Sequence, residues 1–407
     1  MDWQNLGVAP AHILLPQGKA LGAHWPVVAL DQYTSQPEIW QAAEQAIGDA
    51  PSTLRLIVPE AFLHESEQRA SAAAQSMRRY LDEGILAEAL NGFVLVERST
   101  PSGQRMGLVL AIDLEQYDYH PGSRSLIRAT EQTVLDRIPP RQAAREQAVI
   151  ELPHVMLLID DPQDSVIGPL SGLKDKLPLL YDIELMMDGG HLRGWRVDEQ
   201  AELTLVASAL AALKAALKPG EPLYAVGDGN HSLAAAKATW EKHKQNLSSA
   251  ELANHPARYA LVELVNLHSP ALLFEPIHRA VFGSDLAALQ AVLAPLKPVA
   301  DAQAPDITLI SDKQDLPLRL TALDGRLVAD AVQRLLDEAE LQLDYVHGED
   351  ALREIAARDK ALGILMPPFP KDQLFPTVQR DGSLPRKTFS MGEANEKRFY
   401  LEARRIV

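Results

Sequence analysis

The chain has 407 residues, more than one ordinary hydrophobic core can organise, so two domains are predicted. Apolar residues make up 46% of the sequence and charged residues 23%, a balance that is typical of globular proteins and argues against intrinsic disorder. The net charge of −16, with no stripe of Lys and Arg, argues against nucleic acid as a partner. The absence of cysteine excludes disulfides, thiolate metal sites and cysteine nucleophiles.

Neither a membrane span nor a secretion signal is expected. The sequence contains no run of 18 apolar residues, and it opens without a basic region followed by an apolar core. We therefore predict a cytoplasmic protein with no membrane partner. An anionic small molecule is compatible with the acidic net charge where basic side chains converge locally.

Helix and strand patterns are mixed along the first 283 residues, which favours an α+β domain (1–283) with mixed sheets and flanking helices. Its strands are predicted at 27–30, 54–58, 92–98, 105–113, 154–159, 191–197, 223–226 and 259–267. Its helices are predicted at 38–47, 65–83, 199–217 and 232–240. The pattern of predicted helices and strands changes near Gly283, and a smaller C-terminal α/β domain (284–407) is predicted. Its elements are predicted as helices at 284–296 and 327–345 and strands at 307–310, 316–320, 361–366 and 398–406.

Polar residues follow the first predicted strand directly. Asp31 and Tyr33 come just after residues 27–30, and polar groups at the end of a buried strand often line a site, so both are candidates for substrate binding. The alternative is local, because Thr34 or Ser35 could cap the helix that begins near Pro37.

The connection from Tyr117 to Arg145 is long and unusually rich in Arg and hydroxyl groups. Long connections are often functional, and the planar fork of Arg suits phosphate and carboxylate. We interpret four of its residues as substrate-binding candidates: Arg124, Thr133, Arg137 and Arg141. Pro139–Pro140 is expected to interrupt any helix here. The alternative is a solvated surface loop with internal salt bridges.

The stretch from Gly227 to Ser232 carries the strongest chemical signal. It leaves the predicted strand 223–226 and opens the predicted helix 232–240, where glycines and unpaired N–H groups favour binding of an anion. We predict that this turn binds phosphate through Gly227, Gly229, Asn230 and Ser232. Asp228 could accept a proton or bind a cation, and a neutral His231 could donate to a phosphate oxygen or relay a proton, so both are catalytic candidates. The alternative is a tight turn in which Asp228 and Asn230 only satisfy the backbone.

Two further basic segments are candidates for anion contacts. His278 and Arg279 emerge from an apolar stretch, and Lys387 lies in an irregular segment with two hydroxyl residues. We predict substrate binding for His278 and phosphate binding for Arg279 and Lys387. The alternative for His278 and Arg279 is an exposed turn. The alternative for Lys387 is a polar edge. Asp160–Asp161–Pro162 is more typical of a turn than of a metal site, and the metal ligands stay unknown.

Several of these segments resemble the bacterial and archaeal family known as domain of unknown function 1015. Gly227 to Leu233 reads Gly-Asp-Gly-Asn-His-Ser-Leu where many relatives read Asp-Gly-His-His-Arg. The resemblance extends over nearly the whole chain through 129–133, 276–279, 344–348 and 387–391. The family signature is similar to the phosphate-binding turn of the ParB/sulfiredoxin-like fold, which includes nucleotide-dependent free-serine kinases.

The resemblance implies interconversion of serine and phosphoserine, and it places an acid at Glu131, the candidate general base. This chain departs from the family pattern, because Asn230 replaces the first His and Ser232 replaces an Arg that would grip phosphate. Arg279 or an Arg from the 124–141 loop could supply the missing charge. Mg²⁺ and a nucleotide are the cofactors that fit this interpretation.

The leading hypothesis is therefore a phosphotransfer or phosphohydrolase enzyme that acts on a small phosphorylated metabolite, with phosphoserine as the first candidate. A nucleotide-binding regulatory protein without turnover is the alternative, and a structural partner protein is a third possibility. The sequence predicts no oligomeric state.

Overall fold

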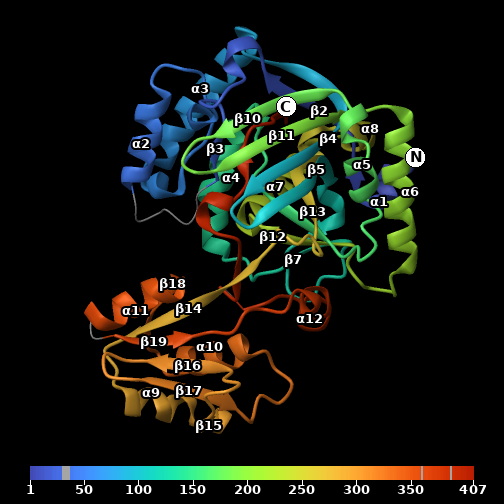
Figure 1. Ribbon diagram of the computed structural model, residues 1–407. Coiled ribbons are helices and arrows are strands. Elements are labelled where there is room, and N and C mark those ends of the chain that lie inside the picture. Colours follow the sequence, from blue (N-terminus) through green and yellow to red (C-terminus); the bar gives the residue numbers. More distant parts are fainter. Residues whose placement is uncertain (30–36, 359–360, 386) are drawn as a thin grey trace. The chain divides into compact units, whose positions relative to one another are not determined.

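The strands predicted at 92–98 and 105–113 form a hairpin inside the larger of the two main sheets. Its two strands are β4 (Leu86–Thr100) and β5 (Gly103–Asp113), which pair antiparallel up to the tight turn between Thr100 and Gly103. The computed structural model describes residues 1–29, 37–358, 361–385 and 387–407 (Figure 1). The predicted substrate-binding residues Asp31 and Tyr33 lie outside the described residues.

The contacts within the chain define two units. Unit 1 comprises residues 1–273, 375–382 and 392–407, and unit 2 comprises residues 274–374 and 383–391. The predicted division at 283/284 differs from this in two respects. Unit 2 begins earlier, because the chain from Phe274 already forms a strand of the second sheet, and the chain returns to unit 1 twice near its C-terminal end.

Unit 1 contains a large mixed sheet in the order β10-β11-β4-β5-β13-β9-β12-β7-β6. In addition, β1 pairs with β5 and β2 pairs with β4. The remaining strands of this sheet are β1 (Val8–Ala9), β2 (Ala11–Pro16), β6 (Tyr117–Asp118), β7 (Ile127–Ala129), β9 (Met156–Ile159), β10 (Leu179–Leu185), β11 (Gly190–Val197), β12 (Tyr224–Asp228) and β13 (Tyr259–Asn266). Short strands β3 (Val27–Val28) and β8 (Ile150–Glu151) pair with β21 (Phe399–Tyr400) and β22 (Arg404–Arg405) from the C-terminal segment.

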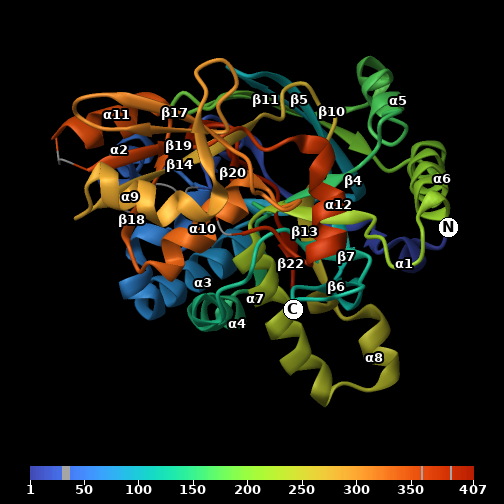
Figure 2. The same cartoon turned by 90° about the horizontal axis from the view of Figure 1, so that it is seen from below.

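The helices of unit 1 cover both faces of this sheet. They are α1 (Trp3–Leu6), α2 (Pro37–Ile47), α3 (Ser66–Asp82), α4 (Ile138–Gln147), α5 (Gly168–Ser171), α6 (Gln200–Ala216), α7 (Asn230–His243), α8 (Ser249–Asn254) and α12 (Leu374–Asp381). Alternate residues of β4 enter different cores, because Phe93 and Leu95 pack with residues of α6 and α7 whereas Val94 and Val96 pack with residues of α2 and α3. Figures 1 and 2 show α3 and α6 on opposite sides of unit 1.

Unit 2 has a smaller sheet, ordered β15-β17-β16-β19-β14-β18, with β20 paired to β14. Its strands are β14 (Phe274–Phe282), β15 (Pro298–Ala300), β16 (Ile307–Ile310), β17 (Asp315–Leu320), β18 (Gln342–His347), β19 (Leu362–Leu365) and β20 (Phe389–Met391). Its helices are α9 (Leu286–Leu293), α10 (Val328–Glu338) and α11 (Glu349–Arg358). Val281 packs with α9 and α10 and its neighbour Ala280 packs with α11, so helices cover both faces of the sheet.

The predicted class, α+β with mixed sheets and a smaller C-terminal part, is confirmed by this arrangement. Four local predictions are wrong. The strand predicted at 398–406 is instead the two short strands β21 and β22. Residues 53–56 form a 3₁₀ turn capped by Ser52 instead of a strand, and the helix predicted at 327–345 ends at Glu338 because Glu340 takes a positive φ of 50° before β18. Pro139–Pro140 lies in the first turn of α4, where a missing N–H costs nothing, and therefore begins a helix rather than interrupting one.

No helix in the described part of the chain combines the length and the apolar character needed to cross a membrane.

Candidate functional site

The Gly227–Ser232 turn joins β12 to α7, as the sequence predicts. Gly229 is the N-cap of α7, with φ of +83° and no side chain to cap the first N–H groups of the helix. A Cβ atom at this position would lie 2.9 Å from Val155 Cγ2, so both the backbone angle and the close approach to Val155 favour glycine. The start of α7 is therefore an uncapped helix N-terminus with partial positive charge.

The 130–134 segment reaches this turn because β7 and β12 are parallel neighbours, with Ala129 opposite Val226. Parallel strands end at the same edge of a sheet, so the residues that follow each strand meet there. The Thr130 N–H donates to Asn230 Oδ1 at 3.2 Å, and the Thr130 hydroxyl donates to the Val226 carbonyl at 2.5 Å. The buried Asn230 side chain thus connects the two strand ends, and its predicted phosphate contact stays a prediction.

His231 is held by the same segment. The Val134 N–H donates to His231 Nε2 at 3.2 Å, so Nε2 carries no proton and the proton of the neutral ring lies on Nδ1. A ring in this tautomer is able to donate from Nδ1 to a phosphate oxygen. Of the two roles predicted for His231, this contact favours donation over proton acceptance at Nε2.

Thr133 lies one residue before Val134 and has an unsatisfied polar group. Its Oγ1 is buried and has no hydrogen-bond partner among the described residues. Leaving a buried hydroxyl unpaired costs roughly 1–3 kcal/mol, which a ligand atom would recover. Glu131 is half-buried in the same short segment, between Thr130 and Thr133.

Asp228 forms an ion pair that the sequence did not reveal. Lys397 Nζ lies 3.0 Å from Asp228 Oδ2, and the exposed fractions of the two side chains are 6% and 21%. Burial alone would raise the pKa of Asp228, but the charge and hydrogen bond of Lys397, with smaller contributions from His154 and the Gly229 N–H, lower that pKa overall. Asp228 is therefore a carboxylate at neutral pH, and Lys397 places a buried cation beside the turn.

Lys397 belongs to a C-terminal segment, residues 392–402, that crosses the α2–α3 face of the sheet. Arg398 lies between two buried acids, with Nη1 at 2.8 Å from Glu263 Oε2 and Nη2 bonded to Glu402, so that its pKa is raised despite burial. Arg98 donates to the carbonyls of Gly189, Asn395 and Lys397. Burial and the neighbouring Arg105 lower the pKa of Arg98 to about 9. These buried charges hold the segment, and with it Lys397, against the strand ends.

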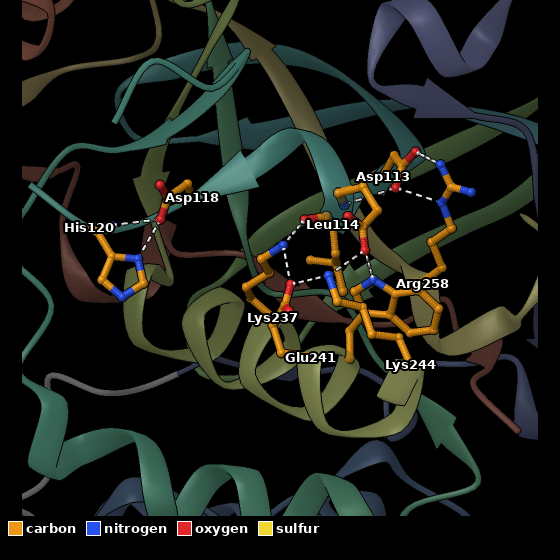
Figure 3. Close-up of polar contacts among 10 residues, drawn as sticks. Asp113, Leu114, Asp118, His120, Lys237, Glu241, Lys244 and Arg258 are labelled. Atoms are coloured by element: carbon orange, nitrogen blue, oxygen red, sulfur yellow. Dashed lines mark hydrogen bonds and ion pairs between the residues drawn. The ribbon is translucent and has the colours of Figure 1, made fainter. Parts of the chain in front are cut away.

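The body of α7 is anchored separately, by polar contacts to the end of β5. Lys237 Nζ donates to the Leu114 carbonyl at 2.8 Å and pairs with Glu241 at 2.7 Å. Lys244 Nζ lies 3.0 Å from Glu115 Oε1, and Figure 3 shows these side chains converging along one side of the helix. The figure also shows His120 paired with Asp118 apart from this group, at 2.6 Å. These contacts fix the direction of the helix that carries the turn.

The arginines predicted in the 124–141 connection divide into two groups. Arg124 is exposed in a loop before β7. Arg137 and Arg141 lie at the start of α4, which packs against α7 through Ile138 and its contacts with Ala234 and Ala235. The two α4 arginines are therefore the predicted basic residues that the structure brings alongside the first turns of α7.

His278, Arg279 and Lys387 belong to unit 2, and all their described contacts lie within it. The Arg279 guanidinium donates to Gln333 Oε1 at 2.7 Å, to the Ile277 carbonyl at 2.5 Å and to the Lys387 carbonyl at 3.1 Å. Burial lowers the pKa of Arg279 to about 10. The Met366 N–H donates to His278 Nδ1 at 3.1 Å. The Lys387 side chain is exposed. These contacts give Arg279 and His278 structural roles, and their predicted ligand contacts stay predictions.

Among the described residues, no group of three or more His, Asp and Glu side chains is arranged to hold a metal ion.

The match to a protein-family model decides the family. The model described as "Protein of unknown function (DUF1015)" matches residues 9–345, which is most of the chain. The chain belongs to this family. The resemblance predicted from the sequence motifs is therefore confirmed for this DUF1015 protein.

Solved structures give only distant similarities. A free serine kinase in complex with AMP is 12% identical, with 73% of this chain and 92% of that chain covered and a TM-score of 0.39. A conserved hypothetical protein from Pyrococcus furiosus is 11% identical, with 72% and 90% covered and a TM-score of 0.35. SbnI with a C-terminal truncation, from Staphylococcus aureus, is 10% identical, with 70% and 82% covered and a TM-score of 0.38.

No functional conclusion follows from similarities this distant. A comparison with curated proteins gives no match.

Proposed function

We propose that this DUF1015 protein is a phosphotransfer or phosphohydrolase enzyme whose Gly227–Ser232 turn binds the phosphate of a small metabolite, with phosphoserine as the first candidate. The observation that carries the proposal is the buried Asp228–Lys397 pair beside the uncapped start of α7. The positive end of the helix favours an anion, and Lys397 offsets the negative charge that Asp228 would otherwise bring to the turn.

The proposed phosphate site uses groups of three kinds. Backbone N–H groups at the start of α7 and the Nδ1–H of His231 donate hydrogen bonds to phosphate oxygens. The Thr133 hydroxyl, which has no partner among the described residues, gives a further donor or acceptor. Lys397 neutralises the Asp228 carboxylate beside the turn. Such preorganised donors stabilise the charge that develops on a transferring phosphoryl group.

Ser232 stands where relatives often carry Arg, so the turn needs positive charge from elsewhere. Arg137 and Arg141 on α4 are better candidates than Arg279, because α4 packs against α7 whereas the Arg279 guanidinium is already bonded within unit 2. We assign the phosphate contact to Arg137, because it immediately precedes Ile138, the residue that packs on α7.

Two carboxylates are available for proton transfer and cation binding. Glu131 is the proposed general base, which takes the proton of an attacking serine hydroxyl or water. Asp228, kept ionised by Lys397, orients a cation held by the phosphates. A nucleotide is the proposed phosphate donor and Mg²⁺ the proposed counter-ion.

The test is conversion of phosphoserine to serine with and without Mg²⁺ and ADP, measured both as released phosphate, which reports hydrolysis, and as ATP formed from ADP, which reports phosphotransfer. Asp228→Asn and His231→Ala are expected to lower turnover by about 100-fold or more. The melting temperature should stay nearly unchanged in His231→Ala, whereas Asp228→Asn leaves the buried Lys397 without its anion and should lower it. Asp182→Asn is the matched control, because Asp182 is an exposed acid on β10, at the other edge of the sheet. Equal turnover in all three variants would remove the turn from the mechanism.

The alternative, a nucleotide-binding regulator, gives a different result in the same assay. It predicts no phosphate release under any condition, together with a rise in melting temperature when a nucleotide is added. A protein that shows neither turnover nor a ligand-induced shift would instead fit the structural partner interpretation.

A further inference from the structure

A cavity in unit 1 lies apart from the turn, between α2, α3 and the chain from 54 to 62. Its volume is about 680 Å³, within the range of sites for small organic ligands. The lining comes from α2, from α3 and from residues 54–62, and it includes no residue of the proposed phosphate site. In Figure 1 these elements lie in the blue part of the chain. An inference about this cavity therefore stands independently of the proposed function.

The inner wall of the cavity is aromatic and carries an unused hydrogen-bond donor. Trp40 is only 4% exposed, and its indole N–H is buried without an acceptor among the described residues. Trp N–H groups that are buried usually find an acceptor. An acceptor atom on a ligand would satisfy this donor.

The opposite wall presents a guanidinium on an aromatic ring. The Arg69 guanidinium carbon lies 4.0 Å from the centre of the Phe62 ring, which makes a flat platform. Arg69 uses its Nε to bond Glu65 at 2.7 Å, and its two Nη groups have no hydrogen bond to another described residue. Those two groups form the edge with which Arg binds carboxylates in a bidentate manner.

The protein as a whole is acidic, but the charge of the cavity lining favours an anionic ligand. Among the described lining residues, Arg55 and Arg69 are cationic and Glu44 is the anionic residue, and Glu44 is already paired with Arg55. Arg69 is thus the cation of the lining that is left to meet a charged ligand. Its partner Glu65 is not part of the lining.

We infer that this cavity binds a small aromatic carboxylate, with the ring on the Phe62–Arg69 platform and the carboxylate between the Arg69 Nη groups and the Trp40 N–H. The ring uses the apolar walls, and the carboxylate satisfies donors that have no partner among the described residues. A neutral aromatic compound would use the walls but leave the two Arg69 Nη groups without an acceptor among the described residues.

The probe is 2-naphthoate, titrated into the full chain by isothermal titration calorimetry, with 2-naphthalenemethanol as the neutral counterpart. One molar equivalent of 2-naphthoate is expected to bind, at least roughly tenfold more tightly than the alcohol, because a hydrogen bond to a charged group stabilises by about 1.5–3 kcal/mol. Arg69→Gln is expected to remove this difference. Trp40→Phe, which keeps an aromatic ring but no N–H, is expected to weaken binding roughly two- to tenfold.

Two variants control for general effects. Arg78→Gln removes an exposed charge from the same helix outside the lining and is expected to leave binding unchanged. Ala72→Trp fills the cavity from an exposed position on α3 and is expected to abolish binding without a loss of melting temperature. The inference is overturned if 2-naphthoate does not bind, if the alcohol binds equally well, or if Arg69→Gln and Arg78→Gln behave alike.

Discussion

The two units gather the motif segments of the family in similar ways but leave their polar groups in different states. In unit 1, parallel strands bring 129–133 beside 227–233, where the Thr133 hydroxyl is left without a partner among the described residues and the start of α7 without a side-chain cap. In unit 2, β14 pairs with β18 and β20, which brings 276–279 beside 344–348 and 389–391. There the Arg279 guanidinium and His278 Nδ1 bond to neighbouring groups of the chain.

This difference distinguishes polar groups that are available to bind a ligand from polar groups that support the fold. A polar side chain whose hydrogen bonds are all made within the fold has little left to offer a ligand, whereas a buried group without a partner gains from one. The turn of unit 1 therefore carries the proposed chemistry, and the polar cluster of unit 2 holds its own sheet together. Four experiments test this contrast between the two units.

The largest effect is expected from Arg398→Met in unit 1. The substitution leaves the buried Glu402 without its cation and leaves the buried Glu263 with the more distant Arg105, at 3.9 Å, and breaking a buried ion pair in this way costs about 3–5 kcal/mol. The five Trp residues all lie in the 1–273 part of unit 1, so urea unfolding followed by Trp fluorescence measures the loss. Arg405→Met, at an exposed position of β22, is the control. Equal unfolding midpoints for the two variants would show that the buried charges do not hold the C-terminal segment.

Arg279→Met is expected to destabilise unit 2 by about 2–3 kcal/mol, because three acceptors lose a charged donor. Circular dichroism, which reports both units, should show an earlier transition while Trp fluorescence stays unchanged. Arg334→Met, in an exposed pair with Glu338 on α10, should cost under about 1 kcal/mol. A loss of phosphate release in the Arg279 variant while unit 2 stays folded would instead put Arg279 in the site, as the sequence predicts.

Acid should weaken unit 2 through His278. Burial lowers the pKa of this ring below its usual 6.5, so the unfolded chain takes up the proton more readily than the folded one. The stability due to neutral His278 is complete above pH 6.5 and declines as the pH falls through the folded-state pKa, when protonation breaks the bond from the Met366 N–H. Circular dichroism melts between pH 7.5 and 5 should show this decline. His278→Asn, which keeps an acceptor but does not titrate, should reduce it, and an unchanged pH profile in that variant would contradict the assignment.

Thr133→Val should change stability least, by under about 0.5 kcal/mol, because the hydroxyl has no partner among the described residues. Affinity for the phosphorylated substrate is nevertheless expected to fall roughly tenfold, which the KM for phosphoserine measures. Thr130→Val is the counterpart, since its hydroxyl bonds Val226 and its loss should cost about 1–2 kcal/mol of stability. A loss of stability in Thr133→Val as large as that in Thr130→Val would remove the distinction between the two hydroxyls.

Much of the fold could be predicted from the sequence, because its strongest signals are local. The β4–β5 hairpin, α6, β13 and the β12–α7 turn follow from apolar spacing and from Gly and Pro positions. The errors occur where one residue or position overrides a pattern. Ser52 caps a 3₁₀ turn over an apolar run, Glu340 ends a long helical pattern with a positive φ, and Pro139 starts a helix because of where it lies.

The candidate site was predictable only in part, for the same reason. Asp228 and His231 lie in one continuous motif, and Thr133 follows from the resemblance to the family. Lys397 was missed because its role depends on a C-terminal segment returning to the strand ends of unit 1, which no local pattern encodes. A signal was present, since Glu396–Lys397–Arg398 places three charges directly before the apolar Phe399, and charges that are followed by a buried stretch need partners.

The order in which the chain is made has a consequence for when this site can exist. Unit 2 is encoded between two portions of unit 1, so residues 274–374 are synthesised before residues 392–407. Until then Asp228 has no Lys397 and Glu263 has no Arg398, and the α2–α3 face of the sheet lacks the segment that covers it. The proposed phosphate site is therefore assembled late, after the inserted unit is already available to fold. A released chain truncated after residue 391 should contain all residues of unit 2 but an incomplete and inactive unit 1.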